Sequence, residues 1–452
     1  MAKYITEDQR KIKVALEADV VVAGGGPFGF SAAIAAARNG AETVLVEHYS
    51  SLGGVATSGL CNIWMGSVPQ VDGGIYRELK TRQLSAGAAV DGYYVAFDPE
   101  VARLIMSEMV EEAKVKPLFY TTAVDAVREN SKIKGIIVES KSGRQAILGK
   151  VVIDATGDGD VAVRAGASYQ MTEIPDRQPS TLMFILGGVD VDFLLRLPQE
   201  KPEWGKNRGT LPDLQANPYP TELDVPKAMI KEAREKGELK AEVAGINVIL
   251  MDRTAYKTGM VTINAAHLDG DPCSNEGLTS MEILGRKQNM AMAKWFRKNV
   301  PGFENCFLAY TAVMMGVRES RRITGDYVLT KEDILSSKKF EDTIANNRFP
   351  MQGHGPGVNN TNVEIPNAYS LPYRCLLPKG LDNILVGGRD ISMDHMVLMS
   401  QRTMPCCFSL GQAAGTAAAL SIRNKVAPRD LDVKRLQRTL MDQGAALNLF
   451  KV

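Results

Sequence analysis

The chain opens its regular structure with a strand, a glycine turn and a helix in immediate succession. Residues 18–23 form a short apolar run with β-branched side chains, which predicts a buried parallel strand. The run leads directly into a GxGxxG pattern at Gly24, Gly26 and Gly29, and the alanine-rich segment 31–39 that follows is a strong helix former. This order is typical of a Rossmann-like α/β unit.

Each part of the unit has a physical role in binding a dinucleotide. Gly24 permits a tight turn, Gly26 lets the backbone approach a pyrophosphate, and Gly29 lets the helix pack closely on the strand. Pro27 and Phe28 stand in the turn before the expected helix, whose N-terminus offers free N–H groups and the positive end of its dipole to phosphate.

An acid and a second glycine pair follow the unit. A second predicted strand at residues 43–46 ends at Glu47, which lies 47 − 24 = 23 residues after the first glycine of the pattern. An acid at this place accepts hydrogen bonds from the ribose hydroxyls of an adenosine. His48 comes next, and Gly53 and Gly54 then form a loop in which the backbone can pass close to a long cofactor.

This segment resembles the start of FAD-dependent oxidoreductases of the glutathione-reductase-like superfamily. The branch it resembles most is related to the succinate dehydrogenase and fumarate reductase flavoproteins. Three later stretches are similar to motifs of that branch: VVIDATGDGD at residues 151–160, NILVGGRD at residues 383–390, and the closing segment at residues 400–417. Together the motifs span residues 18–417, which is nearly the whole chain.

The resemblance implies that FAD is the cofactor and that further residues contact it. Val124 is expected near the adenine, and the ATG motif near the pyrophosphate. Arg389 stands where the family often carries an acid that contacts the ribityl chain, and Asp390, one residue on, is the candidate to replace that acid. The closing helix is expected to turn its N-terminus toward the flavin, where it stabilises negative charge. The additional expected contacts are Val124, Ala155, Thr156, Gly157, Asp158, Gly388, Arg389, Asp390, Cys406 and Cys407.

The resemblance also implies the fold class. We expect an α/β chain with a Rossmann-like FAD-binding domain of the three-layer β/β/α type and an inserted α+β substrate or cap domain. Residues 1–170 are expected to form the first part of the FAD-binding domain, residues 171–375 the cap domain, and residues 376–452 the second part. The long loop at residues 197–220 is either a lid or an ordinary excursion.

Composition excludes several classes of function. Lysine and arginine total 53 and aspartate and glutamate 52, so the formal charge is +1, which argues against nucleic acid as a partner. The N-terminal residues lack the apolar core of a secretory signal, and no apolar run approaches the roughly 20 residues of a membrane span. No CxxC or HExxH pattern occurs. We therefore expect a cytoplasmic protein without a metal site, without membrane insertion and with a small-molecule substrate.

Three residues are candidates for chemistry beside the flavin. His395 and Arg402 flank the start of the closing helix, between two cofactor motifs. Arg402 could bind a substrate carboxylate or polarise a carbonyl, or it could hold a backbone carbonyl. His354 lies in a glycine-rich loop and could exchange a proton with a substrate. For both histidines the alternative is a structural role, packed for His395 and at the surface for His354.

Other motifs leave two interpretations open. The run RESRR at residues 318–322 resembles a family segment and is either an anion-binding or cofactor-supporting group or a solvated charged face. His48 is either an adenosine contact or, as in some relatives, a point of covalent flavin attachment. The neighbours Cys406 and Cys407 are better explained as packed or flavin-adjacent small residues than as a redox disulfide.

The expected activity is that of an FAD-dependent dehydrogenase or reductase, which moves a hydride between a small organic substrate and flavin N5. One alternative is a flavin monooxygenase or halogenase, in which the reduced flavin reacts with oxygen. Another is a flavoprotein subunit that relays electrons to an iron–sulfur partner on another chain. A homodimer is a further expectation.

Overall fold

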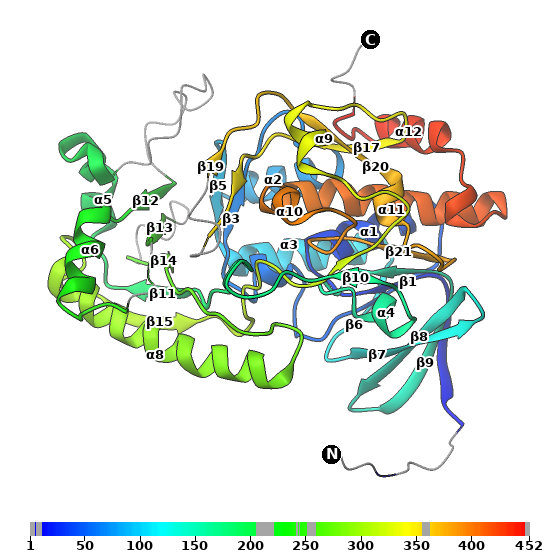
Figure 1. Ribbon diagram of the computed structural model, residues 1–452, viewed down its shortest axis with the longest axis horizontal. Coiled ribbons are helices and arrows are strands. Elements are labelled where there is room, and N and C mark those ends of the chain that lie inside the picture. The colour runs from blue at the N-terminus through cyan, green and yellow to red at the C-terminus, as the bar shows by residue number, and fades with distance from the viewer. Residues whose placement is uncertain are drawn as a thin grey trace.

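The computed structural model describes residues 5, 11–204, 221–240, 243, 245–250, 259–354 and 362–447. Residues 205–220, which make up most of the predicted lid segment, lie outside these ranges. The described chain forms two lobes (Figure 1). The larger lobe contains both ends of the described chain, and the smaller lobe, on the left of the view, is formed by residues from the middle of the sequence.

The larger lobe is organised around a seven-stranded sheet. Five strands run parallel in the order β6-β2-β1-β9-β21, and β8 and β7 continue the sheet from β9 as an antiparallel ribbon. The side chains of Val20, Val21 and Val22 in β1 are all buried, because parallel strands in a sheet of this kind are covered on both faces. The strand bounds are β1 Lys13–Ala23, β2 Thr43–Val46, β6 Lys116–Leu118, β7 Thr122–Glu129, β8 Lys132–Ser140, β9 Gly143–Asp154 and β21 Ile384–Val386.

Two helices pack against each other beside the parallel strands (Figure 1). They are α1 (Pro27–Arg38) and α11 (Met404–Asn424), which are built mainly from alanine and other small residues. A Cβ atom on Gly411 would lie 2.1 Å from the Phe28 carbonyl oxygen, and one on Gly415 would lie 2.0 Å from that of Ala32. The two helix backbones are therefore in direct contact, and their N-termini reach the same end of the sheet.

The larger lobe contains further helices. Asp98 caps one of them, α3, by accepting hydrogen bonds from the backbone N–H groups of Glu100 and Val101. The bounds are α2 Gly74–Ser85, α3 Pro99–Glu112, α4 Asp160–Arg164, α9 Lys331–Leu335, α10 His395–Gln401 and α12 Val433–Asp442, with 3-10 turns η1 Gly54–Ala56, η5 Tyr373–Leu376 and η6 Pro428–Asp430.

Small sheets complete the larger lobe, and none of their strands exceeds five residues. Their strands are β3 Ile63–Met65, β4 Ala89–Val90, β5 Tyr94–Phe97, β10 Tyr169–Gln170, β16 Arg322–Ile323, β17 Thr343–Asn347, β18 Met351–Gln352, β19 Asn362–Val363 and β20 Tyr369–Pro372.

The smaller lobe is a five-stranded antiparallel sheet in the order β12-β13-β14-β11-β15, with helices on one side. Its own apolar core contains Phe184, Trp204, Phe296 and Phe303, all buried. The bounds are β11 Phe184–Gly187, β12 Glu222–Asp224, β13 Asn247–Leu250, β14 Val261–Asn264, β15 Phe307–Thr311, α5 Val191–Glu200, α6 Lys227–Glu235, α8 Asn275–Asn299 and the 3-10 turn η2 Pro202–Trp204.

The Rossmann-like α/β fold predicted from the sequence is confirmed by this topology. The core of the smaller lobe runs from Phe184 to Cys306, whereas Leu329, Ile344 and Tyr369 pack into the core of the larger lobe. The division of the chain at residues 170 and 375 stays a prediction.

The described residues form neither a membrane-spanning helix nor a cluster of metal ligands. No helix among them is both long enough and apolar enough to cross a lipid bilayer. Within the same ranges, no group of three or more histidine, cysteine, aspartate or glutamate side chains is arranged to hold a metal ion.

The contact between α1 and α11 makes a prediction about stability. Gly415→Ala is expected to destabilise the protein by about 1–3 kcal/mol, because the added methyl group forces the helices apart. That loss outweighs the gain of about 1 kcal/mol that alanine brings to a helix interior. Thermal unfolding measures the effect. Gly92→Ala is the control, since its nearest neighbour atom would be the Tyr94 carbonyl oxygen at 3.6 Å. Equal melting temperatures for the two variants would contradict the prediction.

Candidate functional site

A cavity of about 760 Å³ lies between the two lobes. One wall is built from the β1–α1 turn, the carboxyl ends of the parallel strands and the N-terminus of α11, and the other from β12, β14 and the segment before β16. The crevice at the carboxyl ends of parallel strands is where α/β folds of this kind bind ligands. The sequence-predicted residues that line the cavity are Gly24, Gly26, Pro27, Phe28, Glu47, His48, Gly54, Ala155, Thr156, Gly157, Asp158, His354, Gly388, Arg389, Arg402 and Cys407.

The other predicted residues lie within the described ranges but do not line this cavity. Gly29, Gly53, Val124, Asp390 and Cys406 each stand next in the chain to a residue that does, and they therefore form part of the cavity's supporting layer. His395 is the exception, because its ring contacts a buried network described below.

The glycine turn brings three backbone segments into close contact. A Cβ atom on Gly24, where φ is +108°, would lie 2.3 Å from the Ala155 carbonyl oxygen, and one on Gly29 would lie 1.8 Å from the Gly24 carbonyl oxygen. A Cβ atom on Gly26, by contrast, would meet nothing within 4 Å. The space beside Gly26 and the start of α1 is thus open, as a bound pyrophosphate requires.

Glu47 ties the end of β2 to the glycine turn. Its Oε2 accepts a hydrogen bond from the backbone N–H of Gly25 at 2.6 Å, and its Oε1 accepts one from Tyr49 at 2.7 Å. Burial raises the pKa of Glu47, and the two backbone hydrogen bonds oppose that rise. The carboxylate therefore shapes the turn and also faces the cavity.

The second glycine pair packs against the first. The Gly53 N–H donates to the Gly25 carbonyl oxygen at 2.9 Å, and a Cβ atom on Gly54 would lie 3.0 Å from Gly26 Cα. Both residues have positive φ angles, which favour glycine. The pair holds the loop after β2 against the turn.

The end of the cavity beyond Glu47 is lined by the start of β7. His48 Nδ1 forms a hydrogen bond of 2.7 Å with Thr122 Oγ1, and Thr121, Thr122 and Ala123 line the cavity beside it. Val124 is the next residue of the same strand and is half-buried. The strand therefore presents its residues just before Val124 to the cavity.

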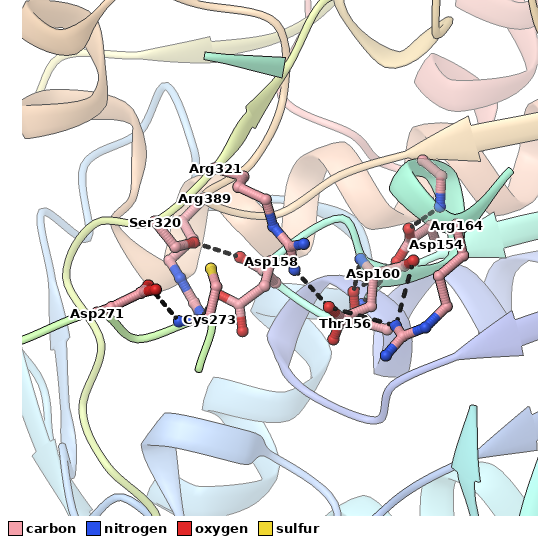
Figure 2. A network of polar contacts seen from close by, with 12 residues as sticks. Asp154, Thr156, Asp158, Asp160, Arg164, Asp271, Cys273, Ser320, Arg321 and Arg389 are labelled. Atoms are coloured by element: carbon pink, nitrogen blue, oxygen red, sulfur yellow. Dashed lines mark hydrogen bonds and ion pairs between the residues drawn. The ribbon is translucent and has the colours of Figure 1, made fainter. Parts of the chain in front are cut away.

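A buried acid organises the turn that follows β9. Asp154 accepts hydrogen bonds from the backbone N–H of Thr156 at 3.1 Å, from Thr156 Oγ1 at 2.7 Å and from the Ala162 N–H at 2.8 Å. The Asp160 N–H in turn donates to Thr156 Oγ1 at 2.9 Å. Figure 2 shows these contacts around the turn. They hold residues 155–158 in place along the cavity wall.

Two arginines complete this network, and each is paired with an acid. Arg321 forms an ion pair with Asp160, and Arg389 forms one with Asp158 at 2.5 Å (Figure 2). Ser320 Oγ lies 3.4 Å from the Gly157 carbonyl oxygen. Part of the charged run at residues 318–322 therefore supports the turn and is not a solvated face.

Asp390 lies beneath the last glycine turn of the sheet. Its side chain is fully buried, and neither carboxyl oxygen has a hydrogen-bond partner among the described residues. Burial, together with the nearby charge of Asp154, raises the pKa of Asp390 well above its ordinary value. Burial therefore favours the neutral form of this carboxyl group. A Cβ atom on Gly388 would come within 3.3 Å of Asp390 Oδ1, so the acid lies directly behind the cavity wall.

The N-terminus of α11 faces the cavity through Thr403, Met404 and Cys407. The fully buried side chain of Cys406 is not among the cavity-lining residues. Burial raises the pKa of both cysteines, that of Cys407 to about 12, so both are neutral thiols at neutral pH. The pair forms no disulfide.

The three candidates for chemistry occupy different places. Arg402 and His354 line the cavity on the side nearer the smaller lobe. His395 is the first residue of α10, and its Nδ1 lies 2.8 Å from Glu319 Oε1. Glu319 is fully buried. His395 thus contacts a buried acid, whereas Arg402 and His354 face the open space.

Sequence reasoning missed His267 and left Arg318 undecided. Both line the cavity, and the rings of His267 and His354 lie 6.1 Å apart. The chain has four histidines, and three of them line the cavity. Their scarcity was the available signal for His267, because no local motif marks that residue.

The fold and the cavity together define a dinucleotide-binding protein of the Rossmann class. The model of the family described as FAD dependent oxidoreductase matches residues 19–440 of the chain. The chain therefore belongs to the FAD-dependent oxidoreductases: it is an enzyme, and its cofactor is FAD.

Similarity to individual proteins is more limited. The chain is 28% identical over 177 residues to thiamine thiazole synthase of Aeropyrum pernix, a match that covers 36% of this chain and 63% of that protein. It is 33% identical over 155 residues to the tRNA uridine 5-carboxymethylaminomethyl modification enzyme MnmG of Geobacter sulfurreducens, which covers 31% of this chain and 24% of that protein. The chain thus spans less than two thirds of the length of these relatives.

A solved structure resembles the chain over more of its length. It is a geranylgeranyl bacteriochlorophyll reductase-like protein from Thermoplasma acidophilum, with 12% sequence identity and a TM-score of 0.49. The match covers 95% of this chain and 84% of that chain.

The raised pKa of the buried Asp390 makes a prediction about pH dependence. Above the ordinary aspartate pKa of 3.8 the unfolded chain is ionised, so folding takes up a proton until the raised pKa of the folded state is reached. Stability from this group is therefore lost as pH rises through that window. Asp390→Asn removes the effect, and the slope of unfolding free energy against pH should change by up to about 1.4 kcal/mol per pH unit.

Urea unfolding of the FAD-loaded protein at a series of pH values measures this slope. Asp430→Asn, at an exposed position, is the control and should leave the slope unchanged. An Asp390→Asn protein whose slope matches that of the parent would mean that the Asp390 carboxyl is ionised in the folded enzyme.

Proposed function

We propose that this enzyme moves a hydride between a carbon atom of a small organic substrate and the flavin of its FAD. The observation that supports the proposal is the continuity of the cavity. One space is lined at one end by the glycine turn and Glu47, and toward the smaller lobe by Arg402 and His354. Bound FAD supplies the acceptor or donor of two electrons, and the chain's residues position the substrate and exchange its proton.

The cofactor lies along the first part of this space. The residues that fit the group are those whose backbone leaves room for it or whose side chains can donate to it or accept from it. They are Gly24, Gly26, Pro27, Phe28, Glu47, His48, Gly54, Ala155, Thr156, Gly157, Asp158, Gly388, Arg389 and Cys407, with Gly29, Gly53, Val124, Asp390 and Cys406 supporting them from behind.

Two side chains act on the substrate in this proposal, and a third holds a supporting position. Arg402 binds or polarises a substrate oxygen, for which its fixed fork of N–H donors is suited. His354 takes up the proton that a substrate O–H or N–H group releases as the adjacent carbon loses its hydride, and returns it in the reverse direction. His395 is a positioning residue, because it contacts Glu319, which holds the backbone of Gln178, whose side chain in turn accepts from Arg402.

We also propose a location and partners for the enzyme. The enzyme works on a small molecule in the cytoplasm. A homodimer and an external electron-transfer partner remain predictions that size-exclusion chromatography and co-purification would test.

Anaerobic reduction of the bound flavin tests the proposed activity. The purified protein is expected to be yellow and to release FAD on denaturation. A panel of alcohols, amines and their carboxylated counterparts is mixed with it without oxygen, and the loss of the oxidised flavin absorbance is recorded. At least one compound should bleach the flavin and yield a product oxidised by two electrons. A product that forms only with oxygen and contains an oxygen atom from it would contradict hydride transfer and favour a monooxygenase.

The role proposed for Glu47 gives a second test. Glu47→Ala removes a carboxylate that orders the glycine turn and faces the ribose, so FAD affinity should fall by roughly 10–100-fold, as expected for a loss of charge-assisted hydrogen bonds. Fluorescence titration of the apoprotein with FAD measures the affinity. Glu42→Ala, at an exposed position just before the same strand, is the matched control. Equal affinity in the two variants would remove Glu47 from the cofactor site.

A further inference from the structure

Two arginines, Arg318 and Arg402, line the part of the cavity that adjoins the smaller lobe. Arg318 precedes β16 and is 7% exposed, and Arg402 is the C-terminal cap of α10. They come from segments 84 residues apart (402 − 318). The positive charge of Arg402 nevertheless lowers the pKa of Arg318, so the two side chains lie within electrostatic reach of each other. Two cations have thus been brought together at one end of an enclosed space.

The hydrogen bonds of these arginines go to neutral acceptors. Arg318 Nη1 donates to the Pro179 carbonyl oxygen at 2.7 Å, and its Nη2 donates to Asn264 Oδ1 at 3.2 Å. Arg402 Nη2 donates to Gln178 Oε1 at 3.2 Å and, at 3.4 Å, to the Gln352 carbonyl oxygen. Within the described residues, neither guanidinium has an ion pair with a carboxylate. Their charges are held in place without being neutralised.

The two arginines beside the turn that follows β9 differ from Arg318 and Arg402, because each of them has a carboxylate partner. Arg389 pairs with Asp158, and Arg321 pairs with Asp160 (Figure 2). Glu319 raises the pKa of Arg402 through its charge but forms no ion pair with it within the described residues. The carboxylate of Glu319 already accepts from Arg322 Nη1 at 2.7 Å, Thr172 Oγ1 at 2.6 Å and the Gln178 N–H at 3.0 Å, and it contacts His395. The oxygens of Glu319 are therefore already occupied by these hydrogen bonds.

Burial disfavours the charged forms of both guanidinium groups. It lowers the pKa of Arg318 to about 9 and that of Arg402 to about 10, and for Arg318 the charge of Arg402 adds to the effect. Both guanidinium groups remain charged at neutral pH. A buried cation without a partner is strongly disfavoured, and a pair of them more so, so the site is completed by an anion from outside the chain.

Two hydrogen-bond donors at the arginine pair lack an acceptor among the described residues. Gln178 Nε2 and Arg402 Nε are both buried, and neither has a hydrogen-bond partner in the described part of the chain. The Gln178 side chain is 1% exposed and is fixed between Glu319, through its backbone, and Arg402, through its amide oxygen. A group with oxygen acceptors is what these donors lack.

We propose that Arg318 and Arg402 together bind a carboxylate group of the substrate. This inference rests on the proposed function and names the class of its substrate: a small organic acid whose reacting carbon lies on the flavin side of the arginines. A carboxylate has two oxygens in one plane, which match the planar fork of a guanidinium. The cavity lining also includes Met65, Met183 and Phe349, whose apolar surface suits the carbon skeleton of an organic acid.

Binding of simple probes to the resting FAD-loaded enzyme tests the inference without turnover. Benzoate, its neutral counterpart benzamide, and inorganic phosphate are titrated by calorimetry, and the flavin absorbance spectrum is recorded in parallel. Benzoate should bind saturably, and benzamide and phosphate should bind at least tenfold more weakly. Equal binding of benzamide, or tighter binding of phosphate, would overturn the assignment of a carboxylate.

Variants locate the site. Arg318→Met and Arg402→Met should each raise the dissociation constant for benzoate at least tenfold. Arg318→Lys and Arg402→Lys keep the charge but lose the fork, and should raise it several-fold, so they decide the question where a methionine variant does not fold. Arg286→Met, an exposed arginine of α8, is the matched control and should bind benzoate like the parent. Unchanged binding in the Arg318 and Arg402 variants would overturn the proposal.

The outcomes separate this inference from the proposed function. Benzoate binding that depends on both arginines, without anaerobic bleaching by any organic acid, would contradict hydride transfer alone. Bleaching by neutral alcohols or amines, in an enzyme whose arginines bind no carboxylate, would contradict the carboxylate site alone.

Discussion

Close backbone contact at the β1–α1 turn is the constraint on which the rest of the structure depends. Gly24 and Gly29 have no room for a side chain, because the Ala155 carbonyl oxygen and the turn itself occupy the space. The ends of β1 and β9 and the start of α1 can therefore meet at one point. Gly411 and Gly415 then let α11 lie directly on α1. The result is a sheet edge and two helix N-termini that converge on one cavity, where backbone N–H groups and helix dipoles favour a phosphate-bearing cofactor.

Charge is distributed unevenly around that cavity, although the chain as a whole carries a formal charge of only +1. At the cofactor turn each arginine has an acid beside it, so Arg321 and Arg389 act mainly as structural ties. Toward the smaller lobe Arg318 and Arg402 have neutral partners only, within the described chain. The first arrangement stabilises the enzyme by itself, and the second leaves two buried cations at the place that we propose for the substrate carboxylate.

Much of the cofactor end could be predicted from the sequence because its signals are local. A strand, a glycine turn, a helix and an acid follow one another within roughly thirty residues, and β2 has the predicted bounds, residues 43–46. The helix expected at residues 31–39 begins earlier, at Pro27, because proline lacks an N–H group and is accommodated in the first turn of a helix. The strand before it begins at Lys13, since pairing with β9 extends it beyond the apolar run.

The chemistry-bearing end could not be predicted in the same way. His395 stood between two cofactor motifs in the sequence, yet its ring contacts the buried Glu319, whereas His354 and the unmarked His267 line the cavity. Similarly, nothing in the run at residues 318–322 indicates that Arg318 would face the cavity while Arg321 and Arg322 pair with acids. Apart from the local pair of Arg322 with Glu319, these contacts join residues that are more than 70 positions apart along the chain.

The sequence by itself determined that this chain forms a Rossmann-like unit and where the backbone comes close enough to hold FAD. It could do so because glycine spacing, strand composition and helix-forming residues act over short distances. Only the tertiary structure decided which charged side chains are neutralised by partners and which are left facing the cavity. The physical reason is that burial and electrostatic interaction depend on distance in space, and the folded chain brings Arg402 to Arg318 and Glu319 to His395 across long stretches of sequence.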